Sequence, residues 1–241
     1  MRIFTLAVIL LSFLTFRSSG QAISEHDSTQ EIAAAVSAYK EATGQFQNLY
    51  NGRQYYLYDN RSEEHQFFDF RKWHKGVIMY DGQRFDSIPL LYDIFKDELI
   101  IKHFNGDHLL LQSEKVGYFK VDNHTFARQE AGKDINEQMR TGFYDVLYNG
   151  SSRTIVRRVK QRQEKIVDKM VIALYPQKNH FYVKKQDRYY NVGSKKSLFN
   201  LFPEHKRELR KVLKEEHINY RRNREVAIVK VVAAYDKLAK P

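Results

Sequence analysis

Eight cationic side chains in the second half of the sequence have the type and spacing needed to bind an anion. They are Arg158, Lys160, Arg162, Lys206, Arg210, Lys214, Arg221 and Arg222. The first three share one face of a strand predicted over residues 153–162, because side chains alternate between the two faces of a strand. The next three form a row on a helix predicted after Pro203, since residues four apart are neighbours on a helix surface. Guanidinium and ammonium groups bind phosphates and carboxylates, so we predict an anion-binding surface here.

The charge of the whole sequence also favours an anionic partner. The 241 residues include 40 Lys and Arg against 29 Asp and Glu, a net charge of +11. Residues 141–241 account for all of this excess, with 24 basic against 10 acidic residues. The candidate partners are an anionic lipid surface, an acidic glycan or an acidic envelope protein. Nucleic acid is not expected, because few aromatic residues interleave the cations. The alternative is an ordinary solvated face, offset by Glu204, Glu208, Glu215 and Glu216.

Two histidines and an aspartate surround a predicted turn and could hold a metal ion. His103, Asp107 and His108 flank the Asn105-Gly106 pair, so a hairpin would bring both imidazoles together. Imidazole and carboxylate are the metal ligands open to a chain that contains no Cys. The alternative is a cross-strand pair beside a turn, in which Asp107 serves the turn. We favour this second interpretation and expect neither a metal centre nor a cofactor.

Carboxylates close to Tyr92 could support acid and base catalysis. Asp93, Asp97 and Glu98 follow this tyrosine closely, and paired carboxylates are the usual catalytic groups of glycosidases. Short nucleophile motifs are missing, since the sequence has no Gly-x-Ser-x-Gly elbow and no glycine-rich phosphate loop. An envelope enzyme that acts on glycan or lipid through carboxylates is therefore the alternative to a non-enzymatic binding protein.

The N-terminal residues predict export from the cytosol. Arg2 provides a positive start, residues 3–16 are mostly apolar, and Gly20 and Ala22 are small residues at the −3 and −1 positions of a cleavage site. This layout is typical of a secretory signal peptide over residues 1–22, and its apolar run is too short for a comfortable membrane span. We expect no transmembrane segment after cleavage, and a location in the periplasm or cell envelope, or secretion. The absence of Cys favours a bacterial envelope.

Asx-Gly pairs predict a β-rich body. Asn51-Gly52, Asp81-Gly82, Asn105-Gly106 and Asn149-Gly150 tolerate the positive φ of a tight hairpin turn, and Asp122-Asn123 predicts a further turn. The 16 Phe and 16 Tyr suit half-buried strand surfaces. Strands joined by short hairpins pair antiparallel, so we predict roughly ten to twelve strands curled into a twisted sheet or incomplete barrel.

The C-terminal residues change to a helical period and complete a predicted α+β fold. A helix predicted over residues 223–238 has an apolar stripe that must pack on another layer. The stripe consists of Ile228, Val231, Val232 and Tyr235. We predict a signal peptide at residues 1–22 and a mainly antiparallel β domain with a short N-terminal helix at 23–193. A basic helical segment at 194–241 would then dock on the sheet.

Several short motifs resemble an uncharacterised family of exported, signal-peptide-bearing proteins of Bacteroidota. The motifs are residues 77–82 (Val-Ile-Met-Tyr-Asp-Gly), 88–93 (Ile-Pro-Leu-Leu-Tyr-Asp), 97–100 (Asp-Glu-Leu-Ile), 195–199 (Lys-Lys-Ser-Leu-Phe) and 234–236 (Ala-Tyr-Asp). The resemblance spans most of the mature chain and implies an exported location, with no catalytic residues to transfer. It also implies that Tyr92 and Asp93 matter to the fold, as a hydroxyl and a carboxylate that close a strand end.

These observations together lead to one expectation of function. We expect a non-enzymatic, exported envelope protein whose basic C-terminal part binds an anionic partner. The field of the C-terminal cations would make such binding weaken as salt is added.

Overall fold

The structure, a computed structural model, describes residues 32, 34–35, 48–59 and 62–239. The chain divides into two units, Met1–Gly44 and Gln45–Pro241, and every element named below belongs to the second unit. The predicted signal peptide lies outside the described residues, as does most of the predicted N-terminal helix.

The described residues form 13 strands and the α-helices α2, α3 and α4, and residues 48–49 are also helical. The strands are β1 (Arg53–Gln54), β2 (His74–Tyr80), β3 (Gln83–Asp93), β4 (Glu98–Lys102), β5 (His108–Leu110), β6 (Val116–Val121), β7 (His124–Gln129), β8 (Gly142–Tyr148), β9 (Thr154–Lys160), β10 (Gln163–Val167), β11 (Met170–Leu174), β12 (Gln177–Lys185) and β13 (Arg188–Asn191). The helices are α2 (Lys195–Asn200), α3 (Lys206–Glu215) and α4 (Arg224–Leu238), with short 3₁₀ turns at Ser113–Lys115 and Pro203–His205.

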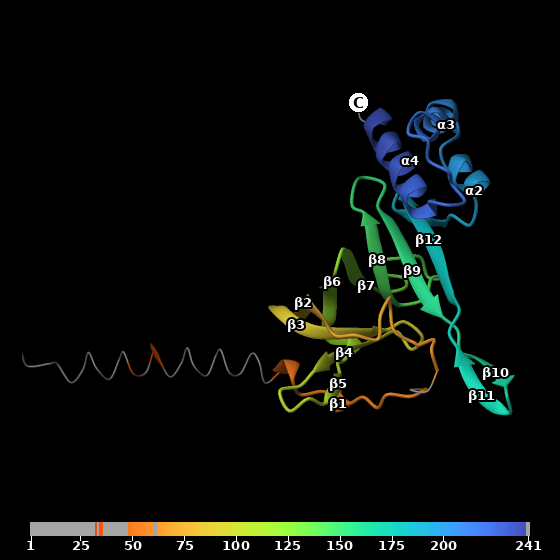
Figure 1. The fold of residues 1–241 in the computed structure, drawn as a ribbon. Coiled ribbons are helices and arrows are strands. Elements are labelled where there is room, and N and C mark those ends of the chain that lie inside the picture. Colours follow the sequence, from red (N-terminus) through yellow and green to blue (C-terminus); the bar gives the residue numbers. More distant parts are fainter. Residues whose placement is uncertain (1–31, 33, 36–47, 60–61, 240–241) are drawn as a thin grey trace, which may run out of the picture. The chain divides into compact units, whose positions relative to one another are not determined.

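Eleven of the strands form one antiparallel sheet (Figure 1). Its order is β1-β5-β4-β3-β2-β6-β7-β8-β9-β12-β13, so most neighbours in the sheet are also neighbours along the chain. Strands β10 and β11 form a separate hairpin that continues from β9 and β12. The sheet is twisted and does not close on itself. This confirms the predicted α+β class, and of the two predicted forms it is the open twisted sheet.

Most of the predicted turns join neighbouring strands. Asp81-Gly82 connects β2 to β3 with φ of 50° and 77°, and Asn105-Gly106 connects β4 to β5 with φ of 95° at the glycine. Asn149-Gly150 and Asp122-Asn123 also lie between paired strands. Asn51-Gly52 was wrongly predicted as a hairpin corner, because it precedes β1, which pairs with β5. At Gly52 a Cβ atom would lie 2.6 Å from the Leu110 carbonyl oxygen, so the glycine allows close strand approach instead.

Aromatic rings from neighbouring strands form the centre of the larger core. Phe119 on β6 stacks on Phe126 on β7 with ring centroids 5.0 Å apart, and Phe143 on β8 meets Phe119 edge to face at 5.2 Å. Tyr92 on β3 contacts the same three rings at 4.9–5.8 Å. All four residues are buried. Each such pair adds about 0.5–1.5 kcal/mol beyond the burial of apolar area, so these contacts favour the observed alignment of the strands.

The C-terminal helices pack on one end of the sheet, over β8, β9 and β12 (Figure 1). Their shared core contains Val156, Phe181 and Val183 from the strands, and Leu198, Phe199, Leu209, Leu213, Ile228, Val231 and Val232 from the helices. The predicted apolar stripe of α4 is thereby confirmed at Ile228, Val231 and Val232. Its fourth member, Tyr235, is half-buried and lies 4.0 Å from Phe202, ring centroid to ring centroid. No helix of the described residues is long and apolar enough to cross a membrane.

Asp236 fastens α4 to the turn between β8 and β9. Its carboxylate accepts hydrogen bonds from the Ser152 backbone N–H at 3.0 Å and from the Tyr148 hydroxyl at 3.1 Å. The residue is only 6% exposed. The last described helix is therefore tied to the sheet by polar as well as apolar contacts.

The loop before β8 covers the opposite face and the edge of the sheet. Ile135 and Met139 from this loop pack with Tyr144, Ile155 and Tyr189. The Asn136 side chain also bonds the backbone of the outermost strand, β13: its Nδ2 donates to the Tyr189 carbonyl at 2.7 Å, and its Oδ1 accepts from the Tyr189 N–H at 3.0 Å. A side-chain amide thus occupies the pairing groups of an edge residue.

A buried network of charges joins the sheet to α4. Arg158 on β9 donates to Asp145 on β8 at 2.6 Å and to Glu225 in the first turn of α4 at 2.7 Å. Asp145 also bonds the His124 imidazole at 2.6 Å. Arg158 and Asp145 side chains are 5% and 1% exposed. Burial of one charge without the other is costly, so the two residues depend on each other.

Replacement of Arg158 by Met should strongly destabilise the fold. The variant leaves the Asp145 carboxylate buried without its main partner, and we expect a loss of about 3–5 kcal/mol in the free energy of unfolding. Urea denaturation measures the change. The control is Arg84→Ala, which removes an exposed pair with Asp86 (both side chains 58% exposed) and should cost less than about 1 kcal/mol. Similar small losses in both variants would contradict a structural role for the network.

The His124 contact should make stability depend on pH. The hydrogen bond to Asp145 raises the pKa of His124 above its usual value. A raised folded-state pKa means that the stabilising contribution is complete below the unfolded-state pKa of about 6.5 and is lost as pH rises through the folded-state value. As pH rises, the free energy of unfolding of the wild-type protein should therefore fall relative to that of His124→Gln. Urea denaturation of both proteins from about pH 5.5 to 8.5 covers the window. Parallel curves would show that His124 carries no such linkage.

Candidate functional site

Two short segments in the helical layer enclose a cationic cavity. One is the start of α2, where Ser194 caps the helix by accepting a hydrogen bond from the Ser197 N–H at 3.1 Å. The other is the connector between α3 and α4, residues 216–223. The cavity has a volume of about 760 Å³. Its lining is Ser194, Lys195, Lys196, Ile218, Asn219, Tyr220 and Arg221.

The sequence of the connector explains its shape. His217 adopts a left-handed conformation with φ of 54°, which ends α3. The Asn219 side-chain oxygen then accepts hydrogen bonds from the backbone N–H groups of Arg221 at 2.9 Å and Arg222 at 3.2 Å. Such an Asx turn holds three consecutive residues in a fixed conformation. Tyr220 thereby packs into the core while the arginine that follows remains exposed.

Tyr220 is the buried polar group of this cavity. The residue is 9% exposed and packs with Phe181 and Leu213 in the core of the helical layer. Its hydroxyl has no hydrogen-bond partner among the residues that the structure describes. A buried hydroxyl without a partner costs roughly 1–3 kcal/mol, so the position is unfavourable for folding alone. The hydroxyl is closed off from solvent, so an anion in the cavity would meet the exposed cations of the lining instead.

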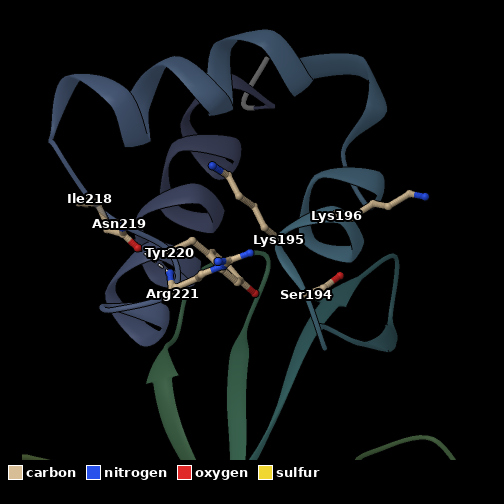
Figure 2. A pocket seen from close by; sticks show the side chains of 7 residues that line it. All are labelled: Ser194, Lys195, Lys196, Ile218, Asn219, Tyr220 and Arg221. Carbon is tan, nitrogen blue, oxygen red and sulfur yellow. Dashed lines mark hydrogen bonds between the residues drawn. The ribbon is translucent and has the colours of Figure 1, made fainter.

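The side chains that line the cavity point in different directions. Figure 2 shows that Tyr220 and Arg221 extend towards the α2 side of the cavity, whereas Lys196 points away from them. Three of the lining side chains are cationic and none carries a carboxylate. Because no carboxylate in the lining neutralises these cations, the cavity has a positive potential that attracts anions.

Arg224 adds a further cation beneath the connector. Its guanidinium carbon lies 4.7 Å from the centroid of the Phe181 ring and 5.9 Å from that of Tyr220. One of its nitrogens donates to the Val192 carbonyl at 2.8 Å. These contacts hold a positive charge behind the tyrosine ring, which favours negative charge near the cavity.

The three predicted anion ligands of β9 have partners inside the protein. Arg158 belongs to the buried charge network. Lys160 donates to the carbonyl oxygens of His65 and Phe67, both at 2.7 Å. Arg162 lies beyond the end of β9, and it bonds Asp59 at 2.7 Å and Glu164 at 2.6 Å. The expected row on one strand face is therefore interrupted, and these residues do not join the C-terminal cavity.

The predicted cations of the helical segment lie on its surface. Lys206, Arg210 and Lys214 occur on α3 in the predicted row; Arg210 and Lys214 are exposed and Lys206 is half-buried. Arg210 also lies over the Phe199 ring at 5.6 Å. Arg221 lines the cavity, and its exposed neighbour Arg222 lines a smaller depression beside Arg224. Anion binding by this surface stays a prediction.

Two of the three carboxylates considered for catalysis, Asp93 and Asp97, are engaged in contacts that hold loops. Asp93 is fully buried and accepts hydrogen bonds from the hydroxyls of Tyr55 at 2.8 Å and Tyr58 at 2.6 Å. Asp97 accepts from Tyr92 at 2.6 Å and pairs with Arg157 at 3.2 Å. The partner of Tyr92 is thus Asp97 rather than Asp93. Burial raises the pKa of Asp97.

The histidines of the β4–β5 turn make local contacts. His103 bonds the Asn105 side chain at 2.6 Å, and Asp107 accepts from the same residue at 2.7 Å. His108 packs against Trp73 with ring centroids 4.9 Å apart. Within residues 48–59 and 62–239, no group of three or more His, Asp or Glu is arranged to hold a metal ion.

The sequence analysis did not identify Tyr220 and the two lysines as residues that line the cavity. Lys195 and Lys196 stood in a motif of the resemblance, without a role. The available signal for Tyr220 is its position: one aromatic residue lies between Asn219 and Arg221, in the short connector of two predicted helices.

No protein-family model, curated protein or solved structure matches the chain. The geometry and charge of the C-terminal cavity are therefore the basis for inferring a function.

Replacement of Tyr220 by Phe should leave both folding and anion binding nearly unchanged. Loss of a hydroxyl without an internal partner should leave the free energy of unfolding within about 0.5 kcal/mol of wild type, or raise it. Binding of an anion in the cavity should change by less than about twofold, because the buried hydroxyl does not reach the cavity. Urea denaturation and a binding titration with inorganic phosphate measure the two effects. A large loss of stability would show that the hydroxyl has a structural partner.

Proposed function

We propose that this chain is a non-enzymatic, exported protein of the cell envelope that binds an anionic lipid surface through its basic C-terminal part. The observation that carries the proposal is the cavity beside α2, which is lined by the exposed cations Lys195, Lys196 and Arg221 and by no carboxylate. A phosphate group would accept hydrogen bonds from these cations.

The surrounding surface supports a lipid layer over a small free anion. Exposed cations continue from the cavity along α3 and the connector, at Arg207, Arg210, Lys211, Lys214 and Arg222. Each basic residue close to an anionic membrane surface contributes about 1 kcal/mol. A membrane would use both the cavity and these exposed cations. One lipid headgroup would enter the cavity, and the anionic surface around it would lie against the cations of α3.

Export is supported by the N-terminal sequence and by the resemblance to exported proteins of Bacteroidota. Residues 1–22 have the layout of a signal peptide. The proposal places the mature chain at the outer side of the cytoplasmic membrane, where anionic headgroups are accessible.

The alternative, an envelope enzyme with carboxylate chemistry, receives less support. Asp93 is fully buried, and Asp97 is occupied by Tyr92 and Arg157. A catalytic carboxylate must reach a substrate proton, and neither group is free to do so in this arrangement.

The double variant Lys195→Gln/Arg221→Gln tests the proposed site. Loss of two charges at the membrane surface should reduce binding to phosphatidylglycerol-containing vesicles by roughly thirtyfold. Co-sedimentation of the full chain measures the bound fraction. The matched control is Lys75→Gln, an exposed cation on β2 outside the helical layer, which should bind as wild type.

Binding measurements with other polyanions and with added salt distinguish an anionic lipid surface from an acidic glycan or an acidic protein. Binding to anionic vesicles at low ionic strength should be lost at about 0.5 M salt, because exposed charges are then screened. Binding to heparin or polyglutamate without binding to vesicles would replace the lipid surface by an acidic glycan or protein. A protein that ignores all three would refute the charge-driven function.

A further inference from the structure

The β10–β11 hairpin projects from the end of the large sheet that lies away from the C-terminal helices (Figure 1). Its turn is Asp168-Lys169, with φ of 48° and 66°. Positive φ at both central residues is typical of the tight two-residue turn that joins paired strands. The chain is exposed throughout residues 163–171. The C-terminal lipid site uses none of these residues, so the inference goes beyond the proposed function and does not depend on it.

Polar contacts fasten the base of the hairpin to the rest of the protein. The Ala173 backbone N–H donates to the Ser62 hydroxyl at 2.9 Å, and the Tyr175 hydroxyl donates to Asp59 at 2.5 Å. Asp59 also accepts a hydrogen bond from Arg162, the residue before β10, at 2.7 Å. Both strands are therefore held at the base, and the tip extends into solvent.

Four aliphatic side chains are exposed at the tip, two on each face of the hairpin. Ile166 and Val171 lie opposite each other across the strands and are 74% and 63% exposed. Val167 and Met170 form the next pair, which faces the other side because side chains alternate along a strand. They are 36% and 65% exposed. Exposed apolar side chains gathered in this way mark a contact surface, and its partner must cover both faces.

The size of the tip favours a lipid bilayer over another protein. Four aliphatic side chains offer roughly a few hundred Å² of apolar surface, whereas a stable protein interface buries about 800 Å² on each partner. A fluid lipid layer needs no such area and surrounds both faces. From Ile166 to the turn is about 7 Å, at about 3.4 Å per residue. This length matches the depth of about 5–10 Å to which apolar groups enter the membrane interface.

The charges at the tip are compatible with shallow insertion. Lys165, the next residue towards the base, is exposed, and its ammonium group would lie at the level of the lipid phosphates. The turn residues Asp168 and Lys169 carry opposite charges, and charged side chains cost little near a membrane interface, unlike at the bilayer centre. The turn would therefore stay among the headgroups, with the aliphatic pairs beside it.

We propose that the tip of the β10–β11 hairpin inserts into the interfacial region of a lipid bilayer through its four aliphatic side chains. The burial of apolar surface drives this contact, so it does not require anionic lipid. In this respect it differs from the C-terminal cavity, whose exposed cations require negative charge.

Co-sedimentation with neutral phosphatidylcholine vesicles at about 0.5 M salt tests the proposal, because exposed charges are screened under these conditions. The full chain should carry Lys195→Gln/Arg221→Gln, so that the C-terminal cavity does not contribute. This protein should bind, with a partition constant of at most about 10⁴ M⁻¹, the value for a single myristoyl chain.

One double variant for each face of the hairpin gives the decisive comparison. Ile166→Ser/Val171→Ser and Val167→Ser/Met170→Ser should each weaken binding at least about tenfold, because a bilayer buries both faces. All four side chains are exposed, so the variants should keep the urea midpoint of the parent protein. The matched control is Phe104→Ser in the β4–β5 turn, where the ring is 78% exposed, and it should bind unchanged.

Three results would overturn the proposal. They are no binding to neutral vesicles, binding that both double variants leave unchanged, and a loss confined to one of the two. The last result would indicate a partner that covers a single face, as a protein surface does. Failure of the C-terminal site to bind anionic vesicles would not alter these readings, because that site is already removed here.

Discussion

A buried guanidinium shared between two carboxylates is the interaction on which the helical layer depends. Arg158 comes from the sheet, as does Asp145, whereas Glu225 comes from the first turn of α4. Glu225 also lies at the positive end of the α4 dipole, which favours its charge there. The start of α4 is therefore held in place, and with it the preceding connector that presents Tyr220 and Arg221. The geometry of the cationic cavity thus originates in a charge network that the cavity itself does not contain.

Local sequence patterns were sufficient to predict the architecture, but they did not predict every individual contact. Asp81-Gly82 and Asn105-Gly106 became hairpin turns because their positive φ angles are a local property of those residues. Asn51-Gly52 has the same composition but serves a close approach to β5, which depends on a strand more than fifty residues away. Short-range turn chemistry and hydrophobic period therefore predicted an antiparallel twisted sheet or incomplete barrel with C-terminal helices, but not the role of every glycine.

For the candidate site, too, the sequence predicted the local charge but not the tertiary contacts. The excess of positive charge near the C-terminus is visible in composition, and Arg221 was predicted from it. Tyr220 was not, because its burial depends on how three helices meet. Arg158 was predicted as a surface ligand since alternation along a strand places it with Lys160. The packing of α4 on that face is a tertiary event, and it converts an apparent surface cation into an internal partner of Asp145.

The side-chain amide of Asn136 protects one edge of the sheet against aggregation. Open sheets end in strands whose free backbone groups can recruit a strand from another molecule, which is a route to aggregation. By bonding both backbone groups of Tyr189, Asn136 takes the place that an incoming strand would need. At the opposite edge, β1 is only two residues long and offers little template. The sheet can thus remain open, with both of its faces available for packing and binding, without inviting growth into fibrils.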